Sequence, residues 1–247
     1  MEVCAVIPAH NEARSIERVV KGTLEHVQLA IVLDDGSNDG TGKLAQRAGA
    51  RVISHEVRQG KGVALRAGLL EAFAQGHDAV VMLDGDGQHV PGEIPRLIEA
   101  ATRGADLVLG DRSGELSRMP LLRRITNQLL TRILGPFVGR GVRDTQCGFR
   151  LITAHLWAAL RLRSRHFEIE SEMLLEASRL GARIVQVPVS VVYACERSKI
   201  RAIPDTARFT IFLFRSALPG SLRSRRVRHQ RQLPLSTVPT RRGVAIR

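Results

Sequence analysis

The amino-acid sequence predicts an α/β protein with a mostly parallel central sheet and helices on both faces. The first observation is that short apolar runs alternate with segments of helical spacing through the first half of the chain. This alternation is typical of strands joined by crossover helices. The second observation is that polar clusters follow four of these runs, where parallel strands would end at one edge of a sheet. The chain has 247 residues and 44% hydrophobic content, which is enough for a sizeable core.

The expected elements of the first half follow in chain order. The apolar runs have the length of buried strands and end at proline, glycine or polar residues. Between them, apolar side chains recur at helical spacing, as Ile16, Val19 and Leu24 do. The predicted strands are 3–7, 30–33, 51–54, 79–83 and 106–109, and the predicted helices are 13–26, 40–48, 61–74 and 94–101.

The second half of the chain is less regular. Segment 120–138 is amphipathic, which predicts either an interfacial helix or an ordinary helix facing the core. Segment 169–180 has helical spacing, and 184–193 predicts one or two strands interrupted by Pro188. A short apolar run, 209–214, comes before Pro219.

The net charge of +13 is unevenly distributed along the chain. Eight of these 13 charges come from residues 221–247, which contain eight arginines, no acidic residue and a composition typical of disorder. We therefore expect one folded domain over residues 1–220 and a basic tail over 221–247. Because aromatic residues make up only 4% of the chain and the basic excess lies in the tail, the sequence does not favour a nucleic-acid partner.

Cysteine content and hydropathy bear on the cellular compartment. Cys4, Cys147 and Cys195 are far apart, which argues against a disulfide framework or a zinc site and favours a reducing compartment. No secretory signal pattern is evident, and no run of about 18 apolar residues could span a bilayer. These features predict a cytoplasmic protein.

The most informative motif is Asp84-Gly85-Asp86-Gly87-Gln88, which follows the predicted strand 79–83. Two carboxylates one residue apart, with glycine beside each, can turn toward one point. Carboxylate oxygens suit a hard divalent cation, Mg²⁺ or Mn²⁺, which in turn binds phosphate. A simple turn is the alternative, because Asp-Gly pairs are strong turn formers.

Five motifs in order resemble family 2 glycosyltransferases: 6–12 (VIPAHNE), 34–41 (DDGSNDGT), 60–62 (GKG), 84–88 (DGDGQ) and 144–150 (DTQCGFR). The sequence is most similar to the branch of polyprenyl- and dolichyl-phosphate sugar synthases, over about residues 3–219. The resemblance implies the nucleotide-binding fold called GT-A. It also implies a nucleoside-diphosphate sugar as donor and Mg²⁺ or Mn²⁺ as cofactor.

The resemblance further implies roles for individual residues. Asp35 would accept a hydrogen bond from the base or ribose, although it could also cap a helix with Ser37 or Asn38. Lys61, between two glycines at a helix start, would approach a phosphate. The donor would be bound by Pro8, Ala9, Asn11, Glu12, Asp35, Lys61, Asp84 and Gly85, and the metal by Asp84, Asp86 and Gln88.

The implied reaction is metal-dependent transfer of a sugar, with inversion, to a polyprenyl phosphate such as dolichyl or undecaprenyl phosphate. A phosphate monoester has a second pKa of about 6, so this acceptor needs cations to hold it rather than a strong base. A hydroxyl acceptor, on a cell-envelope glycan or a small molecule, would need a general base. Glu168, Glu170 and Glu172 are spaced two residues apart, so they cannot all share one helical face. Of the three, we favour Glu170 and Glu172 as residues of the site. The expected catalytic residues are Asp86, Arg112, Arg150, Glu170, Glu172 and Lys199, and Arg197 is a further candidate cation for the acceptor.

Two positions depart from the family pattern. Gly110-Asp111-Arg112 differs from the Ser-Arg of mannosyl-transferring relatives, which leaves the donor sugar open. Cys195-Glu196-Arg197 stands where relatives usually have glycine before the Ser-Lys pair. A lipid acceptor would bring the enzyme to the cytoplasmic face of the membrane as a peripheral protein. There, segment 120–138 could lie in the interface, and the basic tail would be attracted to anionic lipids.

Overall fold

The computed structural model describes residues 1–115, 119, 121–138 and 141–192. The predicted tail 221–247, the apolar run 209–214 and the candidate cations Arg197 and Lys199 lie outside the described residues, so the predicted domain boundary stays a prediction. The elements in chain order are β1 (Val3–Ala9), α1 (Ile16–Leu24), β2 (Leu29–Asp35), α2 (Thr41–Arg47), β3 (Arg51–His55), α3 (Lys61–Ala74), β4 (Ala79–Met82), η1 (Pro91–Glu93), α4 (Ile94–Thr102), β5 (Leu107–Asp111), η2 (Ser113–Glu115), α5 (Leu121–Val138), β6 (Arg150–Thr153), α6 (Ala154–Ala159), α7 (Ile169–Arg179) and β7 (Ile184–Pro188).

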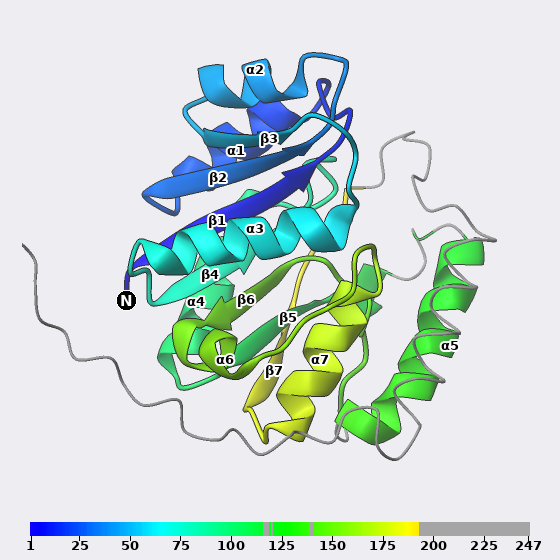
Figure 1. Cartoon of the computed structure of the whole chain (residues 1–247). Helices are drawn as coiled ribbons and strands as arrows, with labels where there is room; N and C mark the ends of the chain where they lie inside the picture. The colour runs from blue at the N-terminus through cyan, green and yellow to red at the C-terminus, as the bar shows by residue number, and fades with distance from the viewer. Residues whose placement is uncertain (116–118, 120, 139–140, 193–247) are drawn as a thin grey trace, which may run out of the picture. The chain divides into compact units, whose positions relative to one another are not determined.

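One seven-stranded sheet organises these elements, in the order β3-β2-β1-β4-β6-β5-β7 (Figure 1). Strands β3, β2, β1 and β4 run parallel, and β7 runs parallel to β5. Strand β6 is antiparallel to both of its neighbours, β4 and β5. The predicted fold class, a mostly parallel α/β sheet, is confirmed.

Side chains of β1 alternate between two layers of helices, as the pleat of a strand requires. Ala5 and Ile7 belong to a buried cluster that also contains residues of α1 and α4. Val6 faces α3 on the other side, where Gly68 lets the helix approach closely, since a Cβ there would lie 2.5 Å from Val6. Figure 1 shows α3 in front of the sheet and α1 and α4 behind it. Helices therefore cover both faces, as predicted.

The main difference from the predicted elements lies between residues 150 and 159. Neither β6 nor the short helix α6 was expected, and together they insert an antiparallel strand into the sheet. Strand β6 has only four residues and begins with an arginine, so its periodicity is too short to reveal it. Thr153 then caps α6 by accepting a hydrogen bond from the backbone N–H of Leu156 at 3.5 Å.

Other predicted elements are confirmed within a few residues. Strand β7 ends at Pro188, and Val191 forms an isolated bridge with His89. Cys4 and Cys147 are buried free thiols, and burial raises their pKa values to about 12 and about 11, so both serve as packing residues. None of the described helices is long and apolar enough to cross a membrane.

Candidate active site

The carboxyl ends of β1 and β2 are joined by a network between their loops. The register places Ala9 opposite Asp34, so the loops that follow the two strands meet. Asn11 has a positive φ of 54°, a conformation that asparagine tolerates better than most residues. Its Oδ1 accepts a hydrogen bond from the N–H of Asn38 at 3.0 Å, and its own N–H donates to Oγ of Ser37 at 2.9 Å. The motifs at 6–12 and 34–41 therefore form one rigid surface.

Asp35 fixes the turn that leads into α3. Its Oδ1 accepts from Nδ1 of His55 at 2.9 Å and from the N–H of Gln59 at 2.8 Å, and its Oδ2 accepts from the N–H of Gly60 at 2.8 Å. Burial opposes the charge of this carboxylate, but these hydrogen bonds lower the pKa of Asp35 overall. Asp35 does not cap a helix at 37–38: the N–H of Ser37 donates to Asp34, and α2 begins at Thr41 with Gly40 as its N-cap and no side-chain cap.

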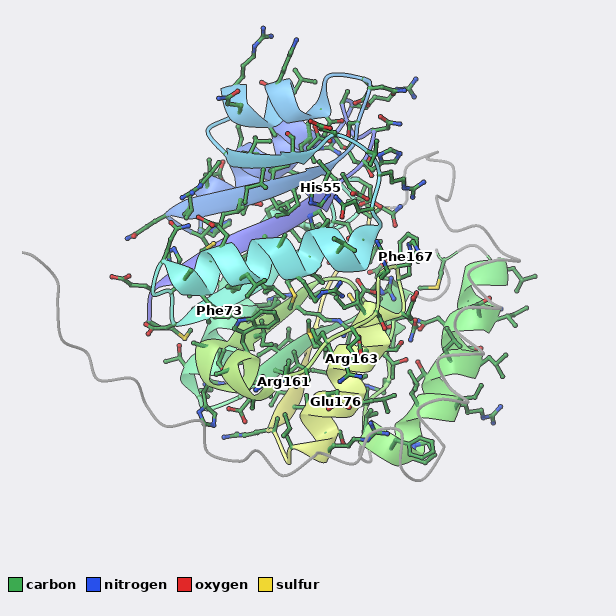
Figure 2. The ribbon with its side chains drawn as sticks, in the orientation of Figure 1. His55, Phe73, Arg161, Arg163, Phe167 and Glu176 are labelled. Carbon is green, nitrogen blue, oxygen red and sulfur yellow. The ribbon has the colours of Figure 1, made fainter. Side chains whose placement is uncertain are left out.

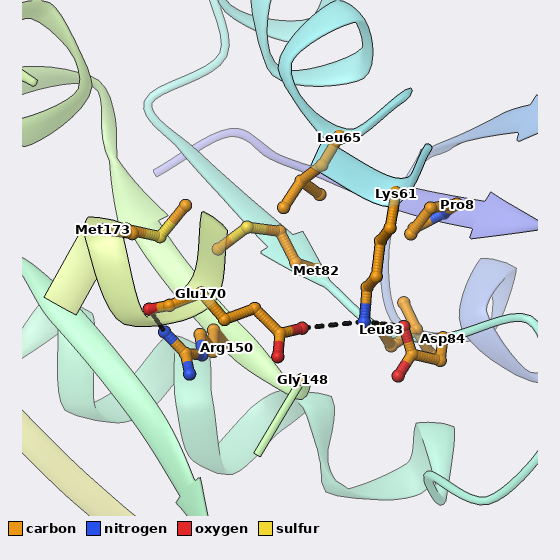
Figure 3. Close-up of a pocket in the computed structure, with 10 residues that line it drawn as sticks. All are labelled: Pro8, Lys61, Leu65, Met82, Leu83, Asp84, Gly148, Arg150, Glu170 and Met173. Atoms are coloured by element: carbon orange, nitrogen blue, oxygen red, sulfur yellow. Dashed lines mark hydrogen bonds and ion pairs between the residues drawn. The ribbon is translucent and has the colours of Figure 1, made fainter. Parts of the chain in front are cut away.

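A lysine joins three separate elements at the centre of the site (Figure 3). Nζ of Lys61, at the start of α3, lies 2.6 Å from Oδ1 of Asp84 after β4 and 2.7 Å from Oε1 of Glu170 in α7. The ring centroid of Phe167 is 5.6 Å from the same nitrogen. Burial alone would lower the pKa of Lys61, but the two carboxylates raise it. The predicted cation is therefore fixed beside the predicted metal-binding aspartate.

Small residues permit this close arrangement. A Cβ on Gly148 would lie 2.8 Å from Oδ2 of Asp84 and 3.1 Å from Oε1 of Glu170, so a side chain at position 148 would collide with the carboxylates. Gly85 packs against Ala9, since a Cβ there would lie 3.2 Å from that of Ala9. The cavity in Figure 3 is lined by Pro8, Lys61, Leu65, Met82, Leu83, Asp84, Gly148, Arg150, Glu170 and Met173.

Asp84 and Asp86 differ in how their charges are supported. Burial opposes the charge of Asp84, but its contacts with Lys61 and His89 lower its pKa overall. Burial and the charge of Asp84 raise the pKa of Asp86, whose Oδ1 accepts from the N–H of Gln88 at 3.0 Å in a tight turn. The predicted turn and the predicted carboxylate pair thus occur together. A divalent cation would relieve the unfavourable charge of Asp86, so the pair fits a metal.

The composition of the site suits a particular kind of metal binding. Mg²⁺ is commonly held by one or two carboxylates together with phosphate oxygens of the substrate. Among the residues that the structure describes, no group of three or more His, Cys, Asp or Glu side chains is placed to hold a metal by itself. The two aspartates match the mode in which the substrate completes the coordination.

His89 is a residue of the site that sequence reasoning missed. Its side chain is buried, with Nε2 3.8 Å from Oδ2 of Asp84 and its ring 5.3 Å from that of Phe149. Its Nδ1 has no hydrogen-bond partner among the described residues. The histidine follows the motif 84–88 directly, but only the fold shows that its ring turns back to Asp84.

The two arginines that were expected at the acceptor are both engaged within the protein. Arg112 forms a bidentate pair with the buried Asp144, with Nε–Oδ2 at 2.6 Å and Nη2–Oδ1 at 3.0 Å. Burial opposes the charge of Asp144, but Arg112 lowers its pKa. The side chain of Arg112 is 15% exposed, so it is held by Asp144 and still reaches solvent.

Arg150 is bonded to backbone groups of the protein. It is 1% exposed and donates to the carbonyl oxygens of Thr145, Cys147 and Glu170 at 2.8, 2.7 and 2.6 Å. These bonds attach the loop 144–150 to α7 and satisfy buried carbonyl groups. Arg150 therefore has a structural role in the wall of the cavity, and its expected contact with an acceptor phosphate stays a prediction.

The two favoured glutamates of α7 also have different partners. Glu170 faces Lys61 in the cavity. Glu172 points to the loop before α7 and accepts hydrogen bonds from the N–H groups of Arg163 and Ser164 at 2.9 and 2.8 Å. Glu172 therefore fixes this loop and lies outside the cavity. Figure 2 shows Phe167 of the same loop at the start of α3, away from Arg163.

The fold and this site define the class: a GT-A glycosyltransferase with its polar residues gathered at the carboxyl ends of the parallel strands. The chain matches the model of Glycosyl transferase family 2 over residues 4–155. It belongs to this family, as the resemblance implied.

Relatives with established names support the same branch. The chain is 33% identical to glycosyltransferase AglJ of Haloferax volcanii over 76% of this chain, and it spans only 62% of that longer protein. It is 31% identical to UDP-N-acetylglucosamine–dolichyl-phosphate N-acetylglucosaminyltransferase of Methanococcus voltae, over 84% of this chain and 92% of the relative. Several further relatives are named as transferring mannose to undecaprenyl, polyprenol or dolichol phosphate. The branch of polyprenyl- and dolichyl-phosphate sugar synthases is confirmed.

A solved structure gives the same fold. The glucosyl-3-phosphoglycerate synthase of Mycobacterium tuberculosis, in complex with Mn²⁺, UDP-glucose and phosphoglyceric acid, superposes with a TM-score of 0.68 at 27% identity. The match covers 87% of this chain and 79% of that protein.

Proposed function

We propose that this protein is a metal-dependent, inverting glycosyltransferase that moves a sugar from a nucleoside-diphosphate sugar to a polyprenyl phosphate. The observation that carries the proposal is the meeting of Asp84, Lys61 and Glu170, with Asp86 beside them, at the carboxyl ends of the strands. Ligands of open α/β sheets bind at this edge.

The donor would lie across the ends of β1, β2 and β4. The joined loops at Asn11 and Asp35 offer a rigid surface for the nucleoside. Asp84 and Asp86 would hold Mg²⁺ or Mn²⁺ beside the diphosphate. When bound, the metal neutralises negative charge on the leaving group. The Mn²⁺ and UDP-glucose in the M. tuberculosis structure support this assignment.

The acceptor phosphate would approach from the side of Arg112 and Glu170. Asp144 holds the guanidinium of Arg112 in one orientation, which lowers the cost of ordering it around an anion. Glu170 is engaged by Lys61, and this favours an acceptor that attacks without a general base. The ionised oxygen of a phosphate monoester meets this requirement. The dolichyl-phosphate acceptor in the name of the M. voltae relative points to the same chemistry.

Helix α5 supports contact with a membrane. Its exposed apolar side chains recur at every fourth position, and they are Leu121, Ile125, Leu129, Ile133 and Phe137. The helix contains three arginines and no acidic residue. Its other side is buried, through Leu134 and Val138, and packs against α7. Such a surface suits the interface of an anionic bilayer, where a polyprenyl phosphate resides, and a peripheral position on the cytoplasmic face.

The M. tuberculosis structure favours one alternative, the same chemistry on a small soluble acceptor, because that protein was solved with phosphoglyceric acid. Product formation screened across UDP-, GDP- and dTDP-sugars, with polyprenyl phosphate or with soluble hydroxyl acceptors, separates the two. We expect metal-dependent transfer to polyprenyl phosphate that EDTA abolishes. Transfer to a soluble acceptor alone would replace the proposal with the alternative, and transfer that survives excess EDTA would remove the metal from it.

A further inference from the structure

Lys61 places a positively charged side chain beside Asp84, the first aspartate of the proposed metal site. Its ammonium lies 2.6 Å from Oδ1 of Asp84 and is only 14% exposed. Figure 3 shows this nitrogen between the carboxylates of Asp84 and Glu170, with Gly148 close to both. Oδ1 of Asp84 is therefore already paired with the ammonium group of Lys61.

The packing around the ammonium keeps it there. Glu170 holds the same nitrogen from α7 at 2.7 Å, and the ring of Phe167 lies 5.6 Å away. The backbone N–H of Gly62, next to the lysine, donates to the carbonyl of Arg165 at 2.9 Å, which fixes the start of α3 against this loop. The backbone beside Lys61 is thus held by a hydrogen bond, and its ammonium group is held by two ion pairs.

We propose that Lys61 competes with the metal ion for Asp84, so that the metal binds strongly only together with the nucleoside diphosphate. The inference rests on the proposed function, because it takes Asp84 as a ligand of the metal. A divalent cation at Asp84 would stand close to the ammonium, and two positive charges at such a separation repel each other. The diphosphate supplies anionic oxygens that attract both cations, so its arrival removes the conflict.

The consequence is a coupling between metal and nucleotide. If the nucleotide strengthens metal binding by some factor, the metal must strengthen nucleotide binding by the same factor. Lys61 sets part of that factor by weakening the metal site when the donor is absent. Glu170 retains the ammonium when Asp84 turns to the metal, so the lysine stays near the diphosphate.

The test is a titration of Mn²⁺ followed by the loss of its free EPR signal, with and without UDP. The variant Lys61→Met should bind Mn²⁺ without UDP about tenfold more tightly than the natural protein, within the usual range of coupling between sites. The gain in Mn²⁺ affinity on adding UDP should shrink accordingly. Lys21→Met is the control, since Lys21 is an exposed lysine that pairs with Glu17 on the same helix and has no contact with Asp84.

Lys61→Gln gives the same comparison should the methionine variant not fold, because an amide is neutral and can donate to both carboxylates. If the Lys61 variants bind Mn²⁺ no more tightly than the natural protein, the lysine does not compete with the metal and the inference fails alone. If the natural protein binds no Mn²⁺ with UDP, GDP or dTDP, the metal dependence in the proposed function fails as well.

Discussion

At the scale of single residues, burial and partners separate side chains that look alike in the sequence. Arg112 and Arg150 were expected to share one task. Arg150 is closed off from solvent and holds three backbone carbonyls, whereas Arg112 is fixed by a carboxylate and remains partly exposed. The exposed part of Arg112 makes it the better candidate of the two for contact with an anion. The same logic separates Glu170 from Glu172.

Asp86 is the residue whose loss should affect chemistry without harming the fold. Asp86→Ala should reduce sugar transfer about 100-fold or more, on the scale of losing one group that stabilises developing charge. Burial and Asp84 raise the pKa of Asp86, so its charge is unfavourable in the folded state and its removal should leave the thermal midpoint unchanged or slightly higher.

Transfer assays and calorimetric unfolding on the same sample check this. Asp78→Ala, at the opposite end of β4 and 59% exposed, is the matched control and should retain activity. Wild-type turnover by the Asp86 variant would remove Asp86 from the site.

Asp35 should affect both nucleotide binding and stability. Asp35→Ala should weaken UDP binding by about 1–3 kcal/mol, as for the loss of a charge-assisted hydrogen bond. It should also lower the thermal midpoint, because the N–H groups of Gln59 and Gly60 lose their shared acceptor. Isothermal titration with UDP measures the first effect. A variant that is less stable but binds UDP normally would leave Asp35 with the turn alone.

The pair between Arg112 and Asp144 predicts a pH-dependent difference in stability. The pKa of Asp144 is lowered in the folded protein, so the pair contributes fully above the ordinary carboxyl pKa of about 3.9 and is lost as the pH falls through the lower folded value. Asp144→Asn should cost roughly 3 kcal/mol at pH 7, as for removal of one partner from a buried pair.

Denaturant unfolding of both proteins from pH 7 down to pH 3 measures this cost. The difference between them should begin to shrink near pH 4 and continue to shrink below it. A cost that stays constant across this range would mean that the ion pair does not stabilise the fold.

At the scale of elements, helix α5 has one buried face and one exposed apolar face. Leu134 and Val138 are buried, and the helix packs against α7, whereas Leu129 is 56% and Phe137 59% exposed. The core-facing interpretation of segment 120–138 therefore holds for one side of the helix. The interfacial interpretation stays a prediction for the exposed side.

Replacing two exposed residues of α5 should weaken membrane binding. Leu129→Gln combined with Phe137→Gln should reduce flotation with anionic liposomes, by about 1 kcal/mol for each side chain, since each buries only part of its surface in the interface. The comparison is Leu70→Gln, an equally exposed leucine (60%) on α3, which should float normally. Equal flotation of all three proteins would assign the apolar face of α5 to some other partner.

At the scale of the whole molecule, the charge distribution predicts that the tail contributes to membrane binding and that the folded domain carries the catalytic activity. Eight arginines lie in residues 221–247, and each contributes roughly 1 kcal/mol of attraction near an anionic surface. Removing 221–247 should therefore reduce flotation, while turnover on detergent-dispersed polyprenyl phosphate is kept.

Salt provides the internal check on this prediction. High ionic strength should reduce flotation of the full chain and have less effect on the shortened one, because charge screening acts on the tail. Loss of turnover on the dispersed acceptor after truncation would place part of the active enzyme in the tail.

The α/β class, the family and the positions of the two aspartates could be predicted from the sequence alone. Local spacing carries this information, since strand and helix periods and a polar cluster after a strand are properties of neighbouring residues. Strand β4 ends at Met82, and Asp84 and Asp86 follow it as the motif predicted. Lys61 at the start of α3 was also placed correctly, beside this motif.

The partners of these side chains, in contrast, depend on contacts between distant parts of the chain. Lys61 meets Glu170 across 109 residues of sequence, and Arg112 meets Asp144 across 32. Strand β6 enters between β4 and β5 in the antiparallel sense, and its first residue, Arg150, bonds to the backbone of α7. Periodicity reports which face of an element is apolar and says nothing about which distant element packs on it. Whether an arginine or lysine side chain binds a ligand or holds the fold together depends on that packing.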